Sequence, residues 1–486
     1  MDPFLQLAEQ GVTIDRLSSD SRRCAPGVAF LAYPGEAADG RAHIGDALAR
    51  GAAAVLWERK DFSWNPGWSV PNLPVQDLKQ RSGVLAHEFY GKPSESLWVC
   101  GVTGTNGKTS CSQWIAALLG SNATKTAVIG TLGAGFPGAL AAATNTTPDA
   151  LETQLLLKSF LNQGARAVAM EVSSHGLVQG RVNGVRFACA LFTNLSHDHL
   201  DYHGSMAAYA RAKAQLFEVP GLGAAVLNLD DAFGAELARR LVGRVRTIGY
   251  SLSSQKPVGV DEFVAAERVA GAKLEIHSSW GKATTTLRQI GRFNVANALG
   301  VLGCLVANGI SFKEGAAMLA TLPPVPGRMQ ALGEEPLVVI DYAHTPDALE
   351  NVLHTLRPVA AERGGRLAVV FGAGGDRDPT KRPVMGAIAA RLADYVLITS
   401  DNPRSEDPFA IISQIEKGVN AAHEVEADRA QAIAKIVSGA HGQDVILIAG
   451  KGHETYQEVA GRRTHFSDEE HARAALSKRE KARRTG

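Results

Sequence analysis

The 486-residue sequence predicts an α/β protein built from three domains. Its length corresponds to about three domains at roughly 150 residues each. Short apolar runs typical of buried strands alternate with helical stretches, a pattern that indicates parallel sheets covered on both faces. A proline-rich connector at residues 322–327 separates two such series, so we place a domain boundary there.

Residues 1–90 are expected to form a small N-terminal α/β domain, because apolar runs at residues 28–32 and 52–56 are joined by turn-rich connections. Residues 91–326 are expected to form a central domain with a parallel sheet. Its strand candidates are residues 97–102, 165–172, 188–193 and 224–229. The helical stretches between them provide the crossovers that parallel strands need.

A glycine-rich segment, Gly101–Thr109, follows the first of these strands and opens a helical pattern at residues 110–119. Glycines let the backbone curl with its N–H groups pointing inward, and the helix N-terminus adds partial positive charge. Lys108 would reach the β- and γ-phosphates of a nucleotide, and the Thr109 hydroxyl would bind Mg²⁺. The segment departs from the G-x-x-x-x-G-K-[ST] pattern in its spacing, and a glycine-rich connector with an incidental lysine is the alternative. We expect a P-loop ATPase domain with ATP bound by Gly104, Thr105, Asn106, Gly107, Lys108, Thr109 and Ser110.

Polar residues follow two later strands of the central domain. Glu171 ends a strand candidate, where a carboxylate can bind Mg²⁺, although a capped strand-end glutamate gives the same pattern. The segment His197–His203 contains three histidines and two aspartates. Since Mg²⁺ prefers oxygen ligands with an occasional imidazole, we expect one of these histidines to be a ligand or a proton carrier. A GTPase is disfavoured because no D-x-x-G followed by N-K-x-D is present.

Residues 327–486 are expected to form a C-terminal Rossmann-like, doubly wound domain. Its strand candidates are residues 337–340, 367–371, 395–399 and 445–449, each followed at once by polar residues or glycine. Ligands of open α/β sheets bind just beyond the carboxyl ends of the strands. Because charged residues and glycines follow all four strands, we expect the carboxyl ends of these strands to form one binding crevice.

The composition excludes several classes of partner. Lys plus Arg is 50 and Asp plus Glu is 49, so there is no basic excess to bind nucleic acid or an anionic membrane. The five cysteines are scattered and form no C-x-x-C, which argues against a disulfide framework or a structural zinc site. Neither a signal peptide nor an apolar stretch of about 20 residues is present. We expect a soluble, cytoplasmic protein.

Five segments together resemble the motifs of the Mur ligases, which build the peptide stem of bacterial peptidoglycan. They are Gly104–Thr109, Glu171–Gly176, His199–Tyr202, Gly291–Asn294 and Asp341–Pro346. The similarity runs in order over nearly the whole chain. It is greatest to the members that add meso-2,6-diaminopimelate to UDP-N-acetylmuramoyl-L-alanyl-D-glutamate. The resemblance implies that these two small molecules are substrates, that ATP and Mg²⁺ are used, that the N-terminal domain binds uridine, and that the protein is a monomer.

The resemblance also implies a mechanism. ATP phosphorylates the γ-carboxylate of the substrate's D-glutamate to give an acyl phosphate, which the incoming amine then attacks. The residues implied in catalysis are Lys108, Glu171, His199 and Lys213, and the implied Mg²⁺ ligands are Thr109, Glu171, His199 and Lys213. On pattern alone Lys213 is a solvent-exposed helical lysine. In the family the matching lysine is carbamylated by CO₂, which turns an ammonium that would repel the metal into an oxygen ligand.

Three further groups of binding residues are carried over from the family. Those for the sugar-peptide are Ser19, Ser21, Asn145, Thr146, Thr147, Ser173, Gln179 and Arg181. Those for adenine and ribose are Asn294, Arg328 and Asp341. Those for diaminopimelate are Arg377, Asp401, Asn402, Pro403, Arg404, Gly450 and Glu454.

Arg404 is expected to select the added amino acid. Diaminopimelate differs from lysine by one distal carboxylate, which an arginine in the pocket can pair with. Faced with lysine, the guanidinium would stay unpaired beside an ammonium, which costs several kcal/mol. Without the family comparison, Asp401–Arg404 reads equally well as a β-turn with a solvated arginine.

Three other functions are alternatives to a Mur ligase. Folylpolyglutamate synthetase shares the ligase architecture, but the N-terminal Ser19–Arg22 segment and the Asp401–Arg404 loop argue against it. A mechanical or switching P-loop ATPase would hydrolyse ATP without an amine acceptor. A dehydrogenase is disfavoured because Gly372–Asp376 lacks the third-glycine spacing of the dinucleotide fingerprint.

Overall fold

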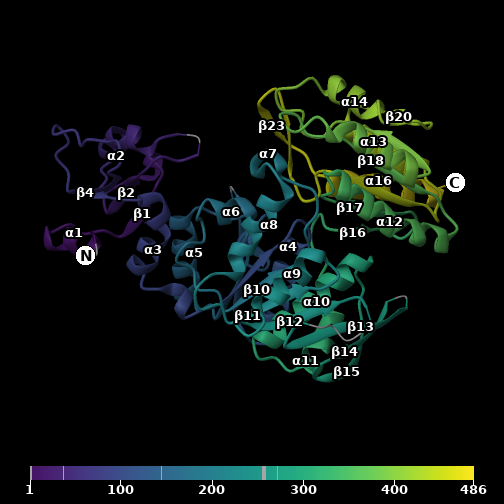
Figure 1. The fold of residues 1–486 in the computed structure, drawn as a ribbon. Coiled ribbons are helices and arrows are strands. Elements are labelled where there is room, and N and C mark those ends of the chain that lie inside the picture. The colour runs from purple at the N-terminus through teal and green to yellow at the C-terminus, as the bar shows by residue number, and fades with distance from the viewer. Residues whose placement is uncertain (1–2, 37, 144, 254–258, 271, 486) are drawn as a thin grey trace.

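The computed structural model describes residues 3–36, 38–143, 145–253, 259–270 and 272–485. Three sheets, each covered by helices, follow one another along the chain, and a two-stranded hairpin lies near the C-terminus. Figure 1 shows the N-terminal unit at one end, the central unit in the middle and the C-terminal unit above it. No helix in the described ranges combines the length and the apolar character that a membrane crossing needs.

The N-terminal unit is a four-stranded parallel sheet in the order β1-β2-β3-β4. Strands β2 and β3 are buried along their whole length, as continuous apolar runs predict. The elements are α1 (Pro3–Glu9), β1 (Arg16–Ser18), β2 (Val28–Ala32), α2 (Ile44–Ala49), β3 (Ala54–Glu58), β4 (Asn72–Val75) and α3 (Leu78–Phe89). Helix α3 packs against α5 (Ala150–Asn162) of the central unit and so joins the two units.

The central unit contains an eleven-stranded sheet in the order β15-β14-β13-β12-β11-β10-β5-β9-β6-β7-β8. Its strands are β5 (Trp98–Thr103), β6 (Thr126–Gly130), β7 (Gly133–Phe136), β8 (Ala139–Ala141), β9 (Ala167–Glu171), β10 (Cys189–Phe192), β11 (Ala224–Asn228), β12 (Arg246–Ser251), β13 (Glu262–Ala270), β14 (Lys273–Ser278) and β15 (Gly281–Thr286). The sheet is parallel from β13 to β6, and antiparallel strands extend both edges. The apolar runs predicted β5, β9, β10 and β11, but neither the parallel strands β6, β12 and β13 nor the antiparallel edge strands.

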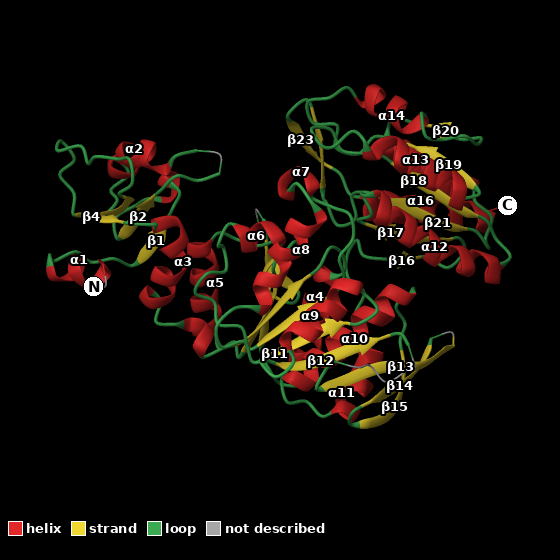
Figure 2. Cartoon of the chain, viewed as in Figure 1, coloured by secondary structure: helices red, strands yellow, loops and turns green. Residues whose placement is uncertain are grey.

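Helices cover both faces of the central sheet (Figure 2). They are α4 (Lys108–Ser121), α5 (Ala150–Asn162), α6 (Ser174–Val178), α7 (Leu200–His203), α8 (Met206–Ala214), α9 (Ala232–Leu241), α10 (Arg292–Ala307) and α11 (Phe312–Met318). Helices α4, α10 and α11 pack on one face, and α5, α6 and α9 pack on the other. Strand β5 lies between β10 and β9, so its carboxyl end opens in the middle of the sheet edge.

The C-terminal unit is a six-stranded sheet in the order β16-β17-β21-β18-β19-β20, followed by the β22-β23 hairpin. Its elements are β16 (Gln330–Leu332), β17 (Leu337–Asp341), α12 (Pro346–Arg363), β18 (Leu367–Phe371), α13 (Lys381–Leu392), β19 (Tyr395–Ile398), α14 (Pro408–Glu416), β20 (Glu424–Val425), α15 (Arg429–Gly439), β21 (Val445–Ala449), β22 (Tyr456–Val459), β23 (Arg462–His465) and α16 (Asp468–Thr485). Helices α12, α13 and α14 cover one face, and α15 and α16 cover the other. This is the doubly wound arrangement expected from the sequence.

Candidate active site

The loop between β5 and α4 has the shape of a phosphate cradle. Gly107 has φ +85° directly before the first helical residue, and a Cβ atom there would lie 2.6 Å from Asn297 Oδ1. Both the conformation and the space therefore require glycine. Lys108 begins α4, and its Nζ donates to the carbonyl oxygens of Gly104 and Thr105 at 2.7 and 2.8 Å. The ammonium thus lies inside the curl of the loop.

The loop backbone is anchored to the segment that follows β10. Asn194 accepts a hydrogen bond from Thr105 N at 2.8 Å through its backbone oxygen and one from Asn106 N at 3.0 Å through its side chain. Ser110 is buried in the first turn of α4. The protein itself therefore holds the loop in place. Asn194 was not among the residues predicted from sequence, because it lies just after the strand candidate at residues 188–193 and belongs to no motif.

Glu171 ends β9 beside this loop, and its side chain is buried. Its Oε2 accepts from Thr109 Oγ1 at 3.0 Å and from Thr131 Oγ1 at 3.1 Å, while Oε1 accepts from Thr131 N at 2.8 Å. These donors are neutral. A buried carboxylate held by neutral donors next to a threonine hydroxyl offers the oxygen ligands that Mg²⁺ takes, so these residues fit the metal that the sequence implies.

The other two predicted metal ligands, His199 and Lys213, come from the N-terminus of α7 and from α8. His199 precedes α7 with φ +53°, and its Nε2 lies 3.4 Å from Asp198 Oδ2. Burial lowers the pKa of His199. Lys213 lies in α8, and its Nζ lies over the Tyr209 ring, 4.4 Å from the centroid. Lys108 is close enough to lower the pKa of both His199 and Lys213.

The burial of Lys213 contradicts the surface position suggested by sequence pattern alone. Its relative exposure is 1%. Burial lowers its pKa well below the ordinary value, and the Lys108 charge lowers it further. Charge repulsion and desolvation both favour the neutral amine. A neutral amine is the form of lysine that can act as a nucleophile.

Lys108 connects the two halves of this edge. Burial lowers the pKa of Lys108, whereas the carboxylates of Glu171 and Asp198 raise it. Glu171 ends β9, and Asp198 lies in the segment His197–His203. Lys108 is therefore close enough to Glu171, His199 and Lys213 for their charges to influence one another.

Several of the residues predicted to bind the sugar-peptide form a connected group next to Glu171. Thr147 Oγ1 lies 3.0 Å from the Glu171 carbonyl oxygen, and the same hydroxyl accepts from Ser173 N at 3.0 Å. Arg181 donates to Thr147 O at 2.8 Å and to Gln179 Oε1 at 2.9 Å. The Thr146 hydroxyl lies 3.1 Å from Thr131 Oγ1, which extends the group to the Glu171 network.

The remaining sugar-peptide candidates lie apart from that group. Ser21 is buried at the start of a short 3-10 turn of the N-terminal unit, and Ser19 lies just before it. Asn145 is exposed. Within the described ranges, no hydrogen bond is seen that joins these three residues to the group around Thr147.

Arg328 connects the C-terminal unit to the phosphate loop. Its Nη2 donates to Thr109 Oγ1 at 3.2 Å, and its guanidinium stacks over the Tyr342 ring. Asp341 ends β17 close by. Burial raises the pKa of the Asp341 carboxyl, and the Arg328 charge opposes that rise. Asn294 is buried in the first turn of α10, and no hydrogen bond in the described part of the chain joins it to Arg328 or Asp341.

A second contact between the same units involves a residue that the sequence motifs did not include. Asp347, in the first turn of α12, accepts from Asn106 Nδ2 at 3.3 Å and from Ser196 Oγ at 2.8 Å. It lies one residue beyond the Asp341–Pro346 motif. One of its partners belongs to the phosphate loop, so the C-terminal unit touches the loop directly.

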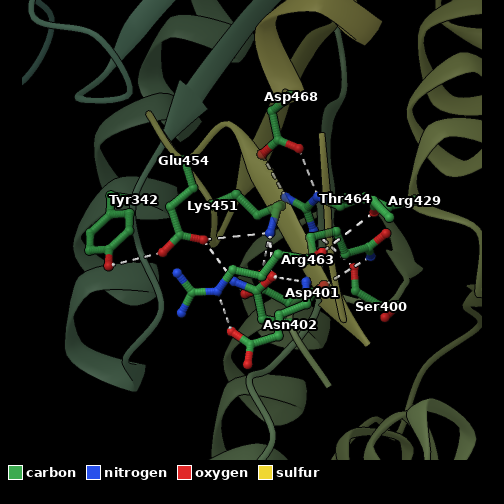
Figure 3. Close-up of polar contacts among 12 residues, drawn as sticks. Tyr342, Ser400, Asp401, Asn402, Arg429, Lys451, Glu454, Arg463, Thr464 and Asp468 are labelled. Carbon is green, nitrogen blue, oxygen red and sulfur yellow. Dashed lines mark hydrogen bonds and ion pairs between the residues drawn. The ribbon is translucent and has the colours of Figure 1, made fainter. Parts of the chain in front are cut away.

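The predicted amino-acid pocket brings together residues from three strand ends (Figure 3). Asn402 Nδ2 donates to Glu454 Oε2 at 2.8 Å, and the Tyr342 hydroxyl donates to Glu454 Oε1 at 3.4 Å. Burial raises the pKa of Glu454, and the Asp401 carboxylate raises it further. Gly450 has φ +118°, and a Cβ atom there would lie 2.9 Å from Asp401 Oδ2. Glycine therefore lets the backbone approach the carboxylate closely.

The two predicted arginines lie at the edge of this group. Arg404 Nη1 donates to Gly375 O at 2.6 Å, and Gly375 lies so close to Pro403 O that a Cβ there would be 1.9 Å away. The glycine-rich loop after β18 therefore packs against the Asp401–Arg404 loop. Arg377 is exposed and donates to the carbonyl oxygen of the preceding residue. Among the described residues, no hydrogen bond joins either arginine to Glu454.

Three cysteines that are far apart in the sequence meet in the core of the central unit. Cys304 Sγ lies 3.9 Å from both Cys100 Sγ and Cys189 Sγ, and all three side chains are fully buried among apolar residues. In the described ranges they form the one group of three or more Cys, His, Asp or Glu side chains with closely spaced ligand atoms. Burial raises the pKa of the Cys304 thiol, so Cys304 packs as a small apolar side chain.

Family models match the three units in chain order. The model described as the Mur ligase family, catalytic domain, matches residues 13–90. The Mur ligase middle domain matches residues 102–305, and the Mur ligase glutamate ligase domain matches residues 327–452.

Individual relatives match over nearly the full length. The UDP-N-acetylmuramoyl-L-alanyl-D-glutamate--2,6-diaminopimelate ligase of Chromobacterium violaceum is 51% identical, with 98% of this chain and 97% of the relative covered. A solved structure of a ligase with the same name has a TM-score of 0.67 and 37% identity, covering 96% of this chain and 95% of the other. The MurF ligase of Thermotoga maritima in complex with ADP has a TM-score of 0.65 at 20% identity, with 96% and 98% of the two chains covered, and shows the shared fold.

Proposed function

The chain belongs to the Mur ligase family, and we propose that the sheet edge and the C-terminal pocket described above are its catalytic and amino-acid sites. The protein is an ADP-forming amide ligase that adds meso-2,6-diaminopimelate to UDP-N-acetylmuramoyl-L-alanyl-D-glutamate in peptidoglycan synthesis. The observation that carries this conclusion is the near full-length identity of 51% to a diaminopimelate ligase. The roles of individual residues are our proposal.

The reaction needs ATP because a carboxylate is inert toward an amine at neutral pH. A γ-carboxylate oxygen of the substrate's D-glutamate attacks the γ-phosphorus of ATP, and ADP leaves. The amine of diaminopimelate then attacks the acyl carbon, loses a proton, and expels phosphate from the tetrahedral intermediate. Most of the catalysis is alignment and charge neutralisation of two anions that repel each other.

Lys108 and the glycine loop are proposed to hold the ATP phosphates. The Lys108 ammonium already lies inside the loop, where it donates to two backbone carbonyl oxygens. Phosphate oxygens are stronger acceptors for an ammonium than carbonyl oxygens are. Thr109 and Glu171 would hold Mg²⁺, which supplies a Lewis acid for the phosphates.

Lys213 is proposed to act as a carbamate. Its buried, weakly basic amine beside Lys108 favours the neutral form that can add to CO₂. The product is an anion, and the ammonium of Lys108 lies near enough to offset its charge. In this form Lys213 and His199 would complete the set of metal-binding groups at the sheet edge.

Substrate binding is proposed to use three sets of residues. Thr146, Thr147, Ser173, Gln179 and Arg181, together with the exposed Asn145, would contact the muramoyl peptide. Ser19 and Ser21 in the N-terminal unit would contact the uridine end. Arg328, Asp341 and Asn294 would contact adenine and ribose.

Diaminopimelate is proposed to bind in the C-terminal crevice. Arg404 and Arg377 would pair with its distal carboxylate, and Glu454, Asp401 and Asn402 would receive its distal ammonium. Pro403 and the Gly450 backbone would shape the walls. A bidentate guanidinium contact discriminates strongly because lysine would leave it unpaired.

We infer the remaining properties from the same family. Residues 1–90, 91–326 and 327–486 are proposed as the uridine-binding, ATPase and amino-acid-binding domains. A nucleotide-linked precursor and ATP are cytoplasmic compounds, so the protein is proposed to work in the cytoplasm, as a monomer. No nucleic acid or membrane partner is proposed, because the net charge of +1 offers no basic excess.

An isotope experiment tests the acyl-phosphate step. The D-glutamate γ-carboxylate of the nucleotide substrate is labelled with ¹⁸O, and the phosphate released during turnover is analysed by mass spectrometry. The proposed route transfers one labelled oxygen to each phosphate, because the carboxylate oxygen attacks phosphorus and later leaves with it. Unlabelled phosphate accompanied by normal amide formation would exclude the acyl phosphate.

A further inference from the structure

A fully buried lysine lies among the residues that are proposed to bind diaminopimelate. Lys451 follows β21, and its Nζ donates to Asn402 Oδ1 at 2.8 Å. The same Nζ lies 3.5 Å from Asp401 Oδ1 and 3.5 Å from Glu454 Oε2. Figure 3 shows these side chains converging on one point. A single ammonium therefore touches three residues that are proposed to bind diaminopimelate.

This lysine fixes the orientation of the Asn402 amide. Asn402 Oδ1 accepts from both Lys451 Nζ and Glu458 N, the latter at 3.0 Å. With the oxygen held by two donors, the amide nitrogen must point the other way, toward Glu454 Oε2 at 2.8 Å. Without the ammonium, one of the two constraints is gone, and a flipped amide would set its oxygen against the carboxylate.

Lys451 is also the cation that balances the two carboxylates of the pocket. Asp401 and Glu454 are close enough that one raises the pKa of the other. The neighbouring Arg429 is fully buried, but its Nε and Nη2 each lie 2.7 Å from an oxygen of Asp468. That pair is neutral as a unit. Arg429 Nη2 also donates to Ala449 O at 2.9 Å, which ties it to the strand end before Gly450.

The charges of the pocket then match those of the distal end of diaminopimelate. Among the buried and partly buried side chains of the pocket, Arg404 and Lys451 are cations and Asp401 and Glu454 are anions, so these four are neutral together. Arg377 is exposed, and its charge is left out of this sum because solvent and salt screen it. The distal end of diaminopimelate carries one carboxylate and one ammonium and is also neutral. The side chain of lysine carries an ammonium alone. A pocket without Lys451 would have one excess negative charge and would favour the cation.

We propose that Lys451 is a positioning residue that sets the specificity of this pocket, by fixing Asn402 and Glu454 and by keeping the pocket electrically neutral. The proposal rests on the assignment of the pocket to diaminopimelate. Lys451 acts through its neighbours: its ammonium is enclosed by Asp401, Asn402 and Glu454, and it lies near the rings of Tyr456 and Phe466. Sequence alone does not reveal this role, because a lysine between two glycines resembles an ordinary turn residue.

The test compares Lys451→Met with Lys451→Arg. Methionine keeps much of the length and the apolar stem but removes the charge, while arginine keeps the charge. The matched control is Lys435→Met, which removes an exposed lysine of α15 that is paired with Glu424. Phosphate release is measured with saturating nucleotide substrate while ATP, meso-diaminopimelate and L-lysine are varied in turn.

For Lys451→Met we expect the KM for diaminopimelate to rise at least about 10-fold, with the KM for ATP within about twofold of wild type. The ratio of kcat/KM for L-lysine to that for diaminopimelate should rise at least about 10-fold, and Lys451→Arg should return it toward wild type. The control should match wild type in all three measurements.

Three results overturn the inference while leaving the proposed function intact. One is an unchanged KM and substrate ratio in Lys451→Met. The second is an equal loss with both amino acids and a lowered Tm, which indicates structural damage alone. If Lys451→Met does not fold, Lys451→Gln is measured in its place. The third overturning result is then a ratio of kcat/KM values in Lys451→Gln that equals the wild-type ratio. By contrast, a wild-type enzyme that does not use diaminopimelate refutes the proposed function itself.

Discussion

Burial governs the chemistry of the two lysines beside the phosphate loop. Burial lowers the pKa of both Lys108 and Lys213, and the Lys108 charge lowers the pKa of Lys213 further. The carboxylates of Glu171 and Asp198 both offset this effect at Lys108, whereas at Lys213 the offset comes from Asp198. We therefore assign the two lysines different states, with Lys108 as the cation and Lys213 as the amine that takes up CO₂.

Replacing Lys213 by alanine should abolish most of the ligase activity. We predict a loss of at least about 100-fold in kcat, because a missing anionic ligand is a transition-state loss. Added formate or another small carboxylate should restore part of the activity by supplying an oxygen ligand. The control is Lys313→Ala, an exposed helical lysine of the same unit. Full activity without formate would refute the role of Lys213.

The lowered pKa of Lys213 also predicts a pH dependence of stability. Between its lowered folded pKa and the ordinary value of 10.5, the unfolded chain binds a proton at this site that the folded chain does not. The free energy of unfolding of the CO₂-free protein should therefore rise with pH in this window, by at most about 1.4 kcal/mol per unit from this group. Lys213→Met lacks this contribution.

Thermal melts of both proteins in CO₂-free buffer check this prediction. The Tm of wild type relative to Lys213→Met should increase as the pH rises toward 10.5. A Tm difference that stays constant over that range would show that Lys213 titrates normally in the folded protein.

A residue could be predicted as a candidate from the sequence alone when it lies in a short recognisable pattern, such as a glycine-rich loop or a strand end. Lys108, Thr109 and Glu171 come from a loop and a strand end, and the structure places Thr109 Oγ1 3.0 Å from Glu171 Oε2. Lys213 and Lys451 depend on burial, which is set by distant segments and leaves no local pattern. Family resemblance supplied the first of these two lysines, and the geometry alone supplied the second.

At the scale of elements, the buried parallel strands were the most predictable part of the fold. Strands β2, β18 and β21 have the limits that their apolar runs indicated. The edge strands were missed for two physical reasons. Strand β14 alternates buried and partly exposed residues. Strand β7 contains Gly133 and Gly135, where a Cβ atom would lie 2.4 Å from backbone oxygens of β8, so its sequence resembles a loop.

The start of α4 offers a test of how the loop conformation supports ATP binding. Gly107→Ala forces a side chain into a left-handed conformation 2.6 Å from Asn297 Oδ1, and the left-handed conformation alone costs about 1–3 kcal/mol. We expect the KM for ATP to rise about 10-fold with little change in the KM for diaminopimelate. Steady-state kinetics measure both.

A matched control lies in the same helix. A Cβ atom added at Gly120 would meet no other atom within 4 Å, and this glycine lies inside α4. Gly120→Ala should leave both KM values unchanged and stabilise the helix by about 0.5–1 kcal/mol. Equal behaviour of the two variants would show that the loop conformation at Gly107 is not needed for ATP binding.

At the scale of the whole molecule, the catalytic edge is assembled from two units. Arg328 reaches Thr109, and Asp347 reaches Asn106 and Ser196, so the C-terminal unit contacts the phosphate loop and its neighbouring segment. The chain order of the units was readable from the sequence. The contacts made by Arg328 and Asp347 could not be predicted from the sequence. They join residues that are far apart in the chain, and no sequence motif specifies such a contact.

Removing one of these contacts should affect the use of ATP more than the integrity of the fold. Asp347→Ala removes two hydrogen bonds to a carboxylate that join the C-terminal unit to the phosphate loop and to Ser196. We expect kcat/KM for ATP to fall about 10-fold or more with a Tm close to wild type. Glu350→Ala, which removes an exposed pair with Arg391 on the same helix as Asp347, is the control and should be nearly neutral. A wild-type kcat/KM in Asp347→Ala would show that this contact is incidental.

The most direct test of the central claim is the dependence of phosphate release on all three substrates. The enzyme is mixed with ATP, Mg²⁺ and UDP-N-acetylmuramoyl-L-alanyl-D-glutamate, and either meso-diaminopimelate or L-lysine is added. We predict sustained phosphate release with diaminopimelate, a product heavier by one diaminopimelate residue in mass spectrometry, and a kcat/KM for L-lysine lower by at least about 100-fold. Equal turnover of L-lysine, or ATP hydrolysis that needs no amino acid, would contradict the claim that the protein is a diaminopimelate-adding ligase.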